Sequence, residues 1–256
     1  MKRGIYILPS IFTVGNMFFG FLSIISSFQE EFTISAWFII ISIAMDILDG
    51  RIARLTGTES AFGVELDSLS DFFSFGVAPS FLMYRLILDN MGKIGLAITF
   101  FFILACALRL ARYNVLAHGS SEPLLHFEGL PAPAAGGLIA AFVLSYELFI
   151  SGPELTAKTI PLLMKRMPLF FHFMPFLMIL ISICMVSKMR YSNFKKVNLK
   201  NPHSLSVLVL VVITILLIAV FPQNTIFLIF FFYLLSGVIS FLIRMLNIRK
   251  KLPFRT

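Results

Sequence analysis

The sequence predicts an all-α integral membrane protein with about eight transmembrane helices. Its 256 residues are 58% hydrophobic and only 13% charged, with a mean hydropathy of +0.92. Apolar runs long enough to cross the hydrocarbon core, which takes about 20 residues, recur along the whole chain. A soluble domain does not carry so many of these runs. The net charge of +8 gathers at their ends, which indicates membrane topology and contact with anionic headgroups rather than nucleic acid.

Eight apolar runs account for the predicted spans in order. The first follows Lys2 and Arg3 and is long enough to remain a span, so no cleavable signal peptide is expected. The second ends in a pair of aspartates, and the third begins with another pair. The last two are joined by a predicted turn over residues 221–224, Phe-Pro-Gln-Asn. The spans are predicted near residues 6–27, 33–51, 66–88, 95–114, 132–150, 167–187, 204–221 and 225–243.

Nothing in the sequence divides the chain into separate units. It shows no repeat, no low-complexity tract and no soluble domain, so residues 1–256 are predicted to form one membrane domain. Cys106 and Cys184 each lie inside an apolar run, and neither has the spacing of a zinc site. We therefore expect neither a disulfide framework nor a zinc centre.

The distribution of Lys and Arg predicts the orientation in the membrane. Sixteen of the 21 lie in segments on the same side as the N-terminus when the eight spans alternate. Because positive charge is retained in the cytoplasm, both termini and the aspartate-rich segment are expected there. The segment 151–166 carries three of the five outer charges. If this segment were placed on the wrong side, the predicted topology would change after the fourth span, but the side of the aspartate-rich segment would not. The outer five are Arg85, Lys93, Lys158, Lys165 and Arg166.

Four of the five aspartates lie in one segment, DILDGRIARLTGTESAFGVELDSLSD. Carboxylates at membrane depth are costly, so this cluster indicates a function. Asp46 and Asp49 are three residues apart, and Asp67 and Asp71 are four apart, so each pair lies on one helical face. The connector 55–65 holds residues suited to a turn and to helix caps. Two such pairs on adjacent helices can face each other and bind magnesium or manganese.

Small residues and one arginine lie between the two aspartate pairs. Gly50, Ala53 and Gly63 permit close approach of a ligand or a neighbouring helix. Arg54 is suited to phosphate, which arginine binds through forked, charge-assisted hydrogen bonds. Four carboxylates in one pocket repel one another unless cations neutralise them, and paired divalent ions are the usual solution in phosphoryl chemistry. The set predicts a diphosphate bound together with metal ions.

These eight residues match Asp-x2-Asp-Gly-x2-Ala-Arg-x8-Gly-x3-Asp-x3-Asp at every position. The pattern resembles the signature of the CDP-alcohol phosphatidyltransferases. Three further segments resemble the integral-membrane phosphatidylserine synthases, which are CDP-diacylglycerol–serine O-phosphatidyltransferases. The resemblance covers about residues 5–150, and branches with other acceptor alcohols share the same framework. The three segments are LPSIFTVGNMFFGF near the N-terminus, LRLARYNV at 108–115 and FEGLPAPAAGG at 127–137.

The resemblance implies transfer of a phosphatidyl group from CDP-diacylglycerol to the hydroxyl of L-serine, with release of CMP. It also implies a homodimer in the cell membrane, and it makes Asp71 the general base. Two magnesium or manganese ions are expected on the diphosphate, held by Asp46, Asp49, Asp67 and Asp71. The CDP moiety is expected beside Asp49, Gly50, Ala53, Arg54 and Gly63. No adjacent Ser–His or Cys–His pair suggests a covalent intermediate, so a direct in-line displacement fits.

The acceptor site has to bind a zwitterion that carries a carboxylate. Arg109 and Arg112, three apart at the inner end of the fourth predicted span, can present one cationic face to the aspartates. They either recognise the serine carboxylate or a lipid phosphate, or serve as positive-inside anchors at the headgroups. Asn114 is a candidate polar partner or a loop cap. Thr13 and Asn16 can touch nucleotide or ion, although hydrogen bonds between helices are their simpler use.

Other functions remain open at the level of sequence. An enzyme of the same family with glycerol 3-phosphate or an inositol phosphate as acceptor needs a larger cationic pocket, and a donor with archaeal ether tails fits the same headgroup site. A divalent cation transporter would carry acidic groups at depth along several spans, whereas here they cluster at one end. The intact pattern argues against a non-catalytic scaffold. The expected partners are CDP-diacylglycerol, L-serine and membrane lipids, without nucleic acid.

Overall fold

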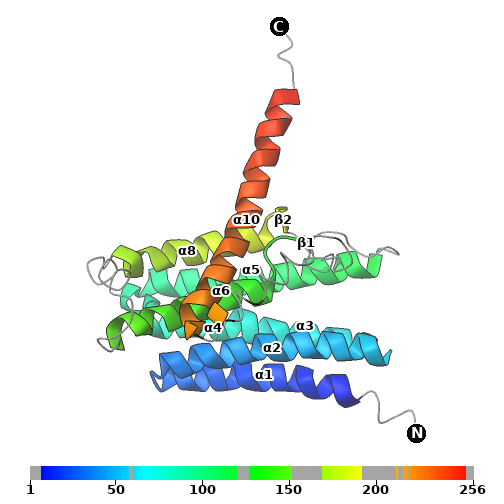
Figure 1. Ribbon diagram of the computed structural model, residues 1–256, viewed down its shortest axis with the longest axis horizontal. Helices are drawn as coiled ribbons and strands as arrows, with labels where there is room; N and C mark the ends of the chain where they lie inside the picture. The colour runs from blue at the N-terminus through cyan, green and yellow to red at the C-terminus, as the bar shows by residue number, and fades with distance from the viewer. Residues whose placement is uncertain are drawn as a thin grey trace.

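The described chain is built from long helices with one pair of two-residue strands (Figure 1), which confirms the predicted all-α class. The structure, a computed structural model, describes residues 7–57, 60–119, 127–151, 169–191, 212, 216–217 and 220–251. The elements are α1 (Ile7–Phe28), α2 (Phe32–Thr56), α3 (Ala61–Asp71), the π-helix η1 (Phe72–Val77), α4 (Ala78–Leu86), the 3-10 helix η2 (Leu88–Met91), α5 (Lys93–Gly119), β1 (Phe127–Glu128), α6 (Ala132–Ser151), α8 (Leu169–Val186), β2 (Arg190–Tyr191) and α10 (Pro222–Lys251).

Most predicted spans correspond to helices of the structure, and the chain is a multi-pass membrane protein. Among the described residues, four helices are long and apolar enough to cross a membrane: Ile11–Phe28, Phe32–Thr56, Lys93–Leu116 and Pro222–Arg244. The shorter apolar helices Ala132–Ser145 and Phe173–Val186 match the fifth and sixth predicted spans. The third predicted span corresponds to the uninterrupted run α3–η1–α4. The predicted seventh span, 204–221, lies largely outside the described residues, so the count of eight stays a prediction.

Several predicted boundaries were wrong by a few residues. Helix α2 continues to Thr56, past the predicted end at residue 51, and stops where Gly57 adopts φ 62° and donates its N–H to the Ala53 carbonyl. Helix α3 begins at Ala61, so Gly63 belongs to its first turn and not to the connector. Helix α10 begins at Pro222, because proline is well tolerated in a first helical turn, so residues 222–224 are helical and not a loop.

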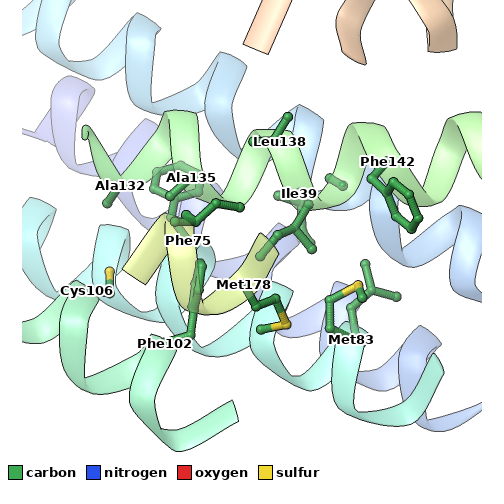
Figure 2. Close-up of a cluster of buried hydrophobic side chains, with 14 of the residues drawn as sticks. Ile39, Phe75, Met83, Phe102, Cys106, Ala132, Ala135, Leu138, Phe142 and Met178 are labelled. Carbon is green, nitrogen blue, oxygen red and sulfur yellow. The ribbon is translucent and has the colours of Figure 1, made fainter. Parts of the chain in front are cut away.

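The core lies where α2, η1, α4, α5, α6 and α8 meet (Figure 2). Ile39, Phe75 and Phe102 are fully buried there, as are Leu138 and Met178. Helix α1 packs along α2, and α6 packs on α2 on one side and on α10 on the other. Glycines permit the close contacts: a Cβ on Gly136 would lie 3.1 Å from the Phe75 Cα. The small residues after the Gly129–Pro133 turn therefore serve helix packing.

Hydroxyl groups attach the α3–η1 run to α1. Ser70 Oγ donates to the Thr13 carbonyl at 3.0 Å, and Ser74 Oγ donates to the Asn16 carbonyl at 2.9 Å. From α2, Ser42 Oγ also donates to the Asn16 carbonyl, at 3.1 Å. The π-helix η1 begins at the residue after Asp71, and such insertions are frequent at functional sites. Three helices are thus held in register around the aspartate-bearing segment.

The strand pair lies at the C-terminal end of α8. Strand β1 pairs antiparallel with β2, with Phe127 opposite Tyr191. Gly129 follows at φ 80° and donates its N–H to the Met189 carbonyl at 2.8 Å. A side chain at this position would collide with the Met185 carbonyl, so both the backbone angle and the space require glycine. The loop before α6 is therefore bound tightly to the end of α8.

Candidate active site

The structure places the two aspartate pairs face to face. Asp46 and Asp49 project from α2, and Asp67 projects from α3, with carboxylate oxygens that all lie within 4.8 Å of one another. The carboxyl groups of Asp46 and Asp71 lie within hydrogen-bonding range, as do those of Asp49 and Asp67. The helix spacing put each pair on one face, and the short connector between α2 and α3 brings the faces together.

The cluster has the donor set of a divalent metal site. Asp49 is 4% exposed, and its Oδ2 has no hydrogen-bond partner among the described residues. The Oδ1 of Asp67 is also buried and also has no hydrogen-bond partner among them. Oxygen-only ligands are those that magnesium and manganese prefer. Carboxylates this close repel one another strongly unless cations lie between them. The residues present therefore fit a metal ion.

Polar groups of α1 orient the carboxylates. Asn16 Nδ2 donates to Asp71 Oδ1 at 3.2 Å, and the Thr13 side chain is hydrogen-bonded to Asp49. Both α1 residues are buried. Hydrogen bonding between helices, the simpler use of Thr13 and Asn16, is thus what the structure shows, and the partners are the site carboxylates themselves. The signal in the sequence was two polar side chains three residues apart in an apolar span.

The predicted CDP-binding residues lie at the open end of the cluster. Gly50 and Ala53 are half-buried on α2, and Arg54 is exposed one turn further on. A Cβ on Gly50 would have only Arg54 Nη2 within 4 Å, at 3.8 Å, so the surface above this glycine is open to a ligand. Gly63 lies in the first turn of α3, where its N–H is bonded to Ser60 Oγ at 3.0 Å.

The structure separates the three predicted acceptor residues. Arg109 is 7% exposed and interacts electrostatically with Asp46 and Asp71, and its Nε has no partner among the described residues. Asn114 Nδ2 donates to Ser68 Oγ at 2.9 Å, across from the aspartate pair of α3.

Arg112 has a different environment from Arg109. Its guanidinium group donates to the carbonyls of Val186 at 2.8 Å and of Glu128 and Ser187 at 3.1 Å. These acceptors include the end of α8, where carbonyls lack helical partners and the helix dipole favours a cation. The prediction of one shared cationic face was therefore wrong: Arg109 lies near Asp46 and Asp71, and Arg112 joins β1 to the end of α8.

Sequence reasoning missed Tyr233, which interacts with Arg109, and Tyr191, which packs against Tyr233. Tyr233 on α10 interacts electrostatically with Arg109, and its ring lies 5.4 Å from the ring of Tyr191 on β2. Both tyrosines are far from Arg109 in the chain and lie beyond the segment that resembles the family. No local pattern could have identified them, because only the packing of α10 and β2 brings them there.

Comparison with known proteins identifies the family of the chain. A family model described as CDP-alcohol phosphatidyltransferase matches residues 6–180. A Helicobacter pylori protein named CDP-diacylglycerol–serine O-phosphatidyltransferase is 37% identical over 244 residues, 95% of this chain and 94% of that protein. A protein of the same name from Methanocaldococcus jannaschii is 41% identical over 55% of this chain and 62% of its own length. An archaetidylserine synthase from Methanothermobacter thermautotrophicus is 34% identical over 72% and 69%.

The range that the family model matches, residues 6–180, contains the aspartate pattern and the helices that carry it. The similarity covers more than half of the chain in the family model and nearly all of it in the Helicobacter protein. The chain belongs to the CDP-alcohol phosphatidyltransferase family.

Proposed function

We propose that the protein transfers the phosphatidyl group of CDP-diacylglycerol to the hydroxyl of L-serine, which yields phosphatidylserine and CMP. The observation that carries the proposal is the cluster of carboxylates from α2 and α3, within 4.8 Å of one another and next to an open glycine and an exposed arginine. The names of relatives that match nearly the whole chain support serine as the acceptor.

The aspartates are the proposed metal ligands. Asp46, Asp49, Asp67 and Asp71 would hold two magnesium or manganese ions, which neutralise the diphosphate and polarise the reacting phosphoryl group when bound. The open surface above Gly50 admits the diphosphate, and the exposed Arg54 donates to its oxygens. Asp49, Ala53 and Gly63 line the rest of the proposed CDP site.

Asp71 is the proposed general base. Its Oδ1 accepts a hydrogen bond from Asn16 Nδ2, which fixes the carboxylate and leaves Oδ2 to take the serine proton. A carboxylate is a weak base toward a hydroxyl, so removal of the proton is concerted with attack of the serine oxygen on the β-phosphorus. The bond from that phosphorus to the bridging oxygen breaks, and CMP leaves with the electron pair.

Arg109 is the proposed partner of the serine carboxylate. It is a buried cation beside the base, and its Nε is unpartnered within the described part of the chain. A carboxylate placed there holds the amino acid with its hydroxyl near Asp71. Asn114 is proposed to support the site indirectly, by donating to Ser68, the residue after Asp67. Arg112 is proposed to hold α8 in place through its hydrogen bond to the Val186 carbonyl.

The remaining proposals concern the setting of the site. The bias of Lys and Arg toward one side supports cytoplasmic termini and a cytoplasmic active site. Family membership supports a homodimer, and the absence of any internal division in the sequence supports one catalytic domain over residues 1–256.

An acceptor panel tests the proposed reaction. The full-length chain in detergent micelles with CDP-diacylglycerol should release CMP with L-serine only when magnesium or manganese is added. Ethanolamine should give less than about a hundredth of the serine rate, because it has no carboxylate and leaves the buried Arg109 unpaired. Glycerol 3-phosphate and an inositol phosphate should also react more slowly than serine, because their phosphate group needs a larger cationic pocket. Turnover with glycerol 3-phosphate but not with serine would contradict serine as the acceptor. If no alcohol gave turnover, the proposal that the protein is a phosphatidyltransferase would be contradicted.

Substitutions of Arg109 and Arg112 should have different effects on serine binding and on stability. Arg109→Met should raise the KM for serine more than about tenfold, since it removes a charged hydrogen bond that is worth roughly 1.5–3 kcal/mol. Arg112→Met should leave that KM within twofold but lower the melting temperature by about 5 °C, since three carbonyls lose their donor. Steady-state kinetics and thermal unfolding of both variants check this. An equal rise in KM for both would contradict the separate roles.

A further inference from the structure

Asn16 has a buried amide oxygen with no hydrogen-bond partner among the described residues. The residue is 0% exposed and lies within α1. Its Nδ2 donates to Asp71 Oδ1 at 3.2 Å. An ionised carboxylate only accepts hydrogen bonds, so the NH2 side of the amide has to face Asp71. The oxygen of the same amide therefore lies close to the proposed base as an unused acceptor, and buried acceptors are rarely left unpaired.

Hydrogen bonds and close packing fix the position of Asn16. Its backbone carbonyl accepts from Ser42 Oγ of α2 at 3.1 Å and from Ser74 Oγ of η1 at 2.9 Å. Gly20, one turn further along α1, lies so close to Ser74 that a Cβ there would overlap the Ser74 hydroxyl. The side chain is held at its far end by Asp71. A group fixed in this way binds a ligand with little loss of side-chain freedom.

The other unpartnered buried oxygens that the structure describes on α1, α2 and α3 have different roles or positions. Two of them, on Asp49 and Asp67, belong to the proposed metal site. The third, Thr33 Oγ1, lies in the first turn of α2, about 20 Å along the helix from Asp46. Asn16 Oδ1 is therefore the acceptor next to the base that neither the proposed metal site nor the proposed CDP site uses.

We propose that Asn16 is an acceptor-binding residue: its Oδ1 accepts a hydrogen bond from the ammonium group of serine and so selects an amino acid over a hydroxy acid. The inference rests on the proposed transfer to serine. An ammonium group only donates hydrogen bonds, and in serine two carbon atoms separate it from the hydroxyl oxygen. An acceptor beside Asp71 is thus within its reach while the hydroxyl faces the base. With Arg109 on the carboxylate, each polar group of serine has its own partner.

The test measures the preference of the full-length protein for serine over 3-hydroxypropionate, which has the hydroxyl and the carboxylate but a hydrogen in place of the ammonium group. In Asn16→Leu the ratio of the two kcat/KM values should fall about tenfold from wild type, as expected for one hydrogen bond to a charged group. Loss of the contact to Asp71 slows both acceptors equally, so it cancels in the ratio, and so does the folded fraction of the preparation. Asn16→Ala, which removes the amide without adding bulk, should give the same fall.

Ser23→Ala is the matched control for loss of a buried polar group from α1. Ser23 is fully buried, about 10 Å further along the same helix, and its Oγ lies 2.9 Å from Ser35 Oγ. Ser35 keeps Ser27 as a partner when Ser23 is replaced, so the helix contact survives. The preference for serine over 3-hydroxypropionate should stay within twofold of wild type in this variant.

Two results would overturn the inference. If Asn16 only supported Asp71, or bound a metal ion, both rates would fall by the same factor and the preference of Asn16→Leu would equal that of the wild type. A tenfold loss of preference in Ser23→Ala as well would show that disturbance of α1, and not the amide oxygen, is responsible. Wild-type turnover with serine tests the proposed function separately, so either result in an enzyme that uses serine counts against Asn16 alone.

Discussion

Asp71→Asn should abolish transfer while donor binding largely survives. The amide oxygen of asparagine can still accept the hydrogen bond from Asn16 Nδ2 that the structure shows at 3.2 Å, so the local packing is kept. The amide cannot take a proton from the serine hydroxyl. Loss of a general base typically lowers the rate by about 10²–10⁴-fold. CMP release should therefore fall by at least about a hundredfold, measured with saturating serine and CDP-diacylglycerol.

Donor binding provides the control for this variant. The dissociation constant of CDP-diacylglycerol in the presence of manganese is measured by calorimetry on the detergent-solubilised protein. It should stay within about threefold of wild type, a change below ~1 kcal/mol, since the substitution leaves the three clustered carboxylates of Asp46, Asp49 and Asp67 unchanged. A variant that has lost donor binding as severely as turnover would show that Asp71 acts in binding rather than as a base.

Asp46→Asn should weaken metal binding and donor binding together. Asp46 supplies one of three carboxylates that each offer an oxygen within 4.8 Å of the others, so it would hold the same ion as Asp49 and Asp67. Removing one of several anionic ligands should reduce manganese affinity by roughly tenfold or more, comparable to the effect of losing a ligand-supporting contact. Manganese titration followed by electron paramagnetic resonance, and CDP-diacylglycerol binding at several manganese concentrations, measure the two effects.

Glu65→Gln is the matched control for Asp46→Asn. Glu65 lies on α3 close to the cluster in sequence but is exposed and outside the aspartate pattern. The substitution removes the same charge without removing a ligand. Donor binding to Asp46→Asn should recover partly as manganese is raised, and Glu65→Gln should behave as wild type. Equal weakening by both substitutions would mean that general negative charge, and not a built metal site, attracts the cation.

The carboxylate cluster could be predicted because its geometry is local. Asp46 and Asp49 lie on one helix and Asp67 and Asp71 on the next, and helical periodicity alone puts each pair on one face. Because the connector between α2 and α3 is short, the two faces lie against each other. The errors at the ends of α2 and α3 did not matter for the site, since a boundary shift of a few residues moves no side chain to another face.

The two arginines of α5 show the limit of prediction from local sequence. Arg109 and Arg112 have the spacing that predicts a shared face, and the structure gives them different partners. Arg112 is drawn to the unpaired carbonyls at the end of α8, which begins more than fifty residues further along the chain. Arg109 remains beside Asp71. Nothing near either arginine in the sequence distinguishes them, because the distinction comes from the position of α8.

The sequence by itself determined the membrane class, the order of most helices and the carboxylates that meet at the ends of α2 and α3. These features follow from hydropathy and from periodicity within single helices, which depend on neighbouring residues only. The tertiary structure alone decided which polar group each arginine meets and brought Tyr233 of α10 near Arg109 of α5. Contacts between distant segments depend on how whole helices pack, since steric fit, as at Gly237 against the Tyr191 ring, is decided only when both surfaces are in place.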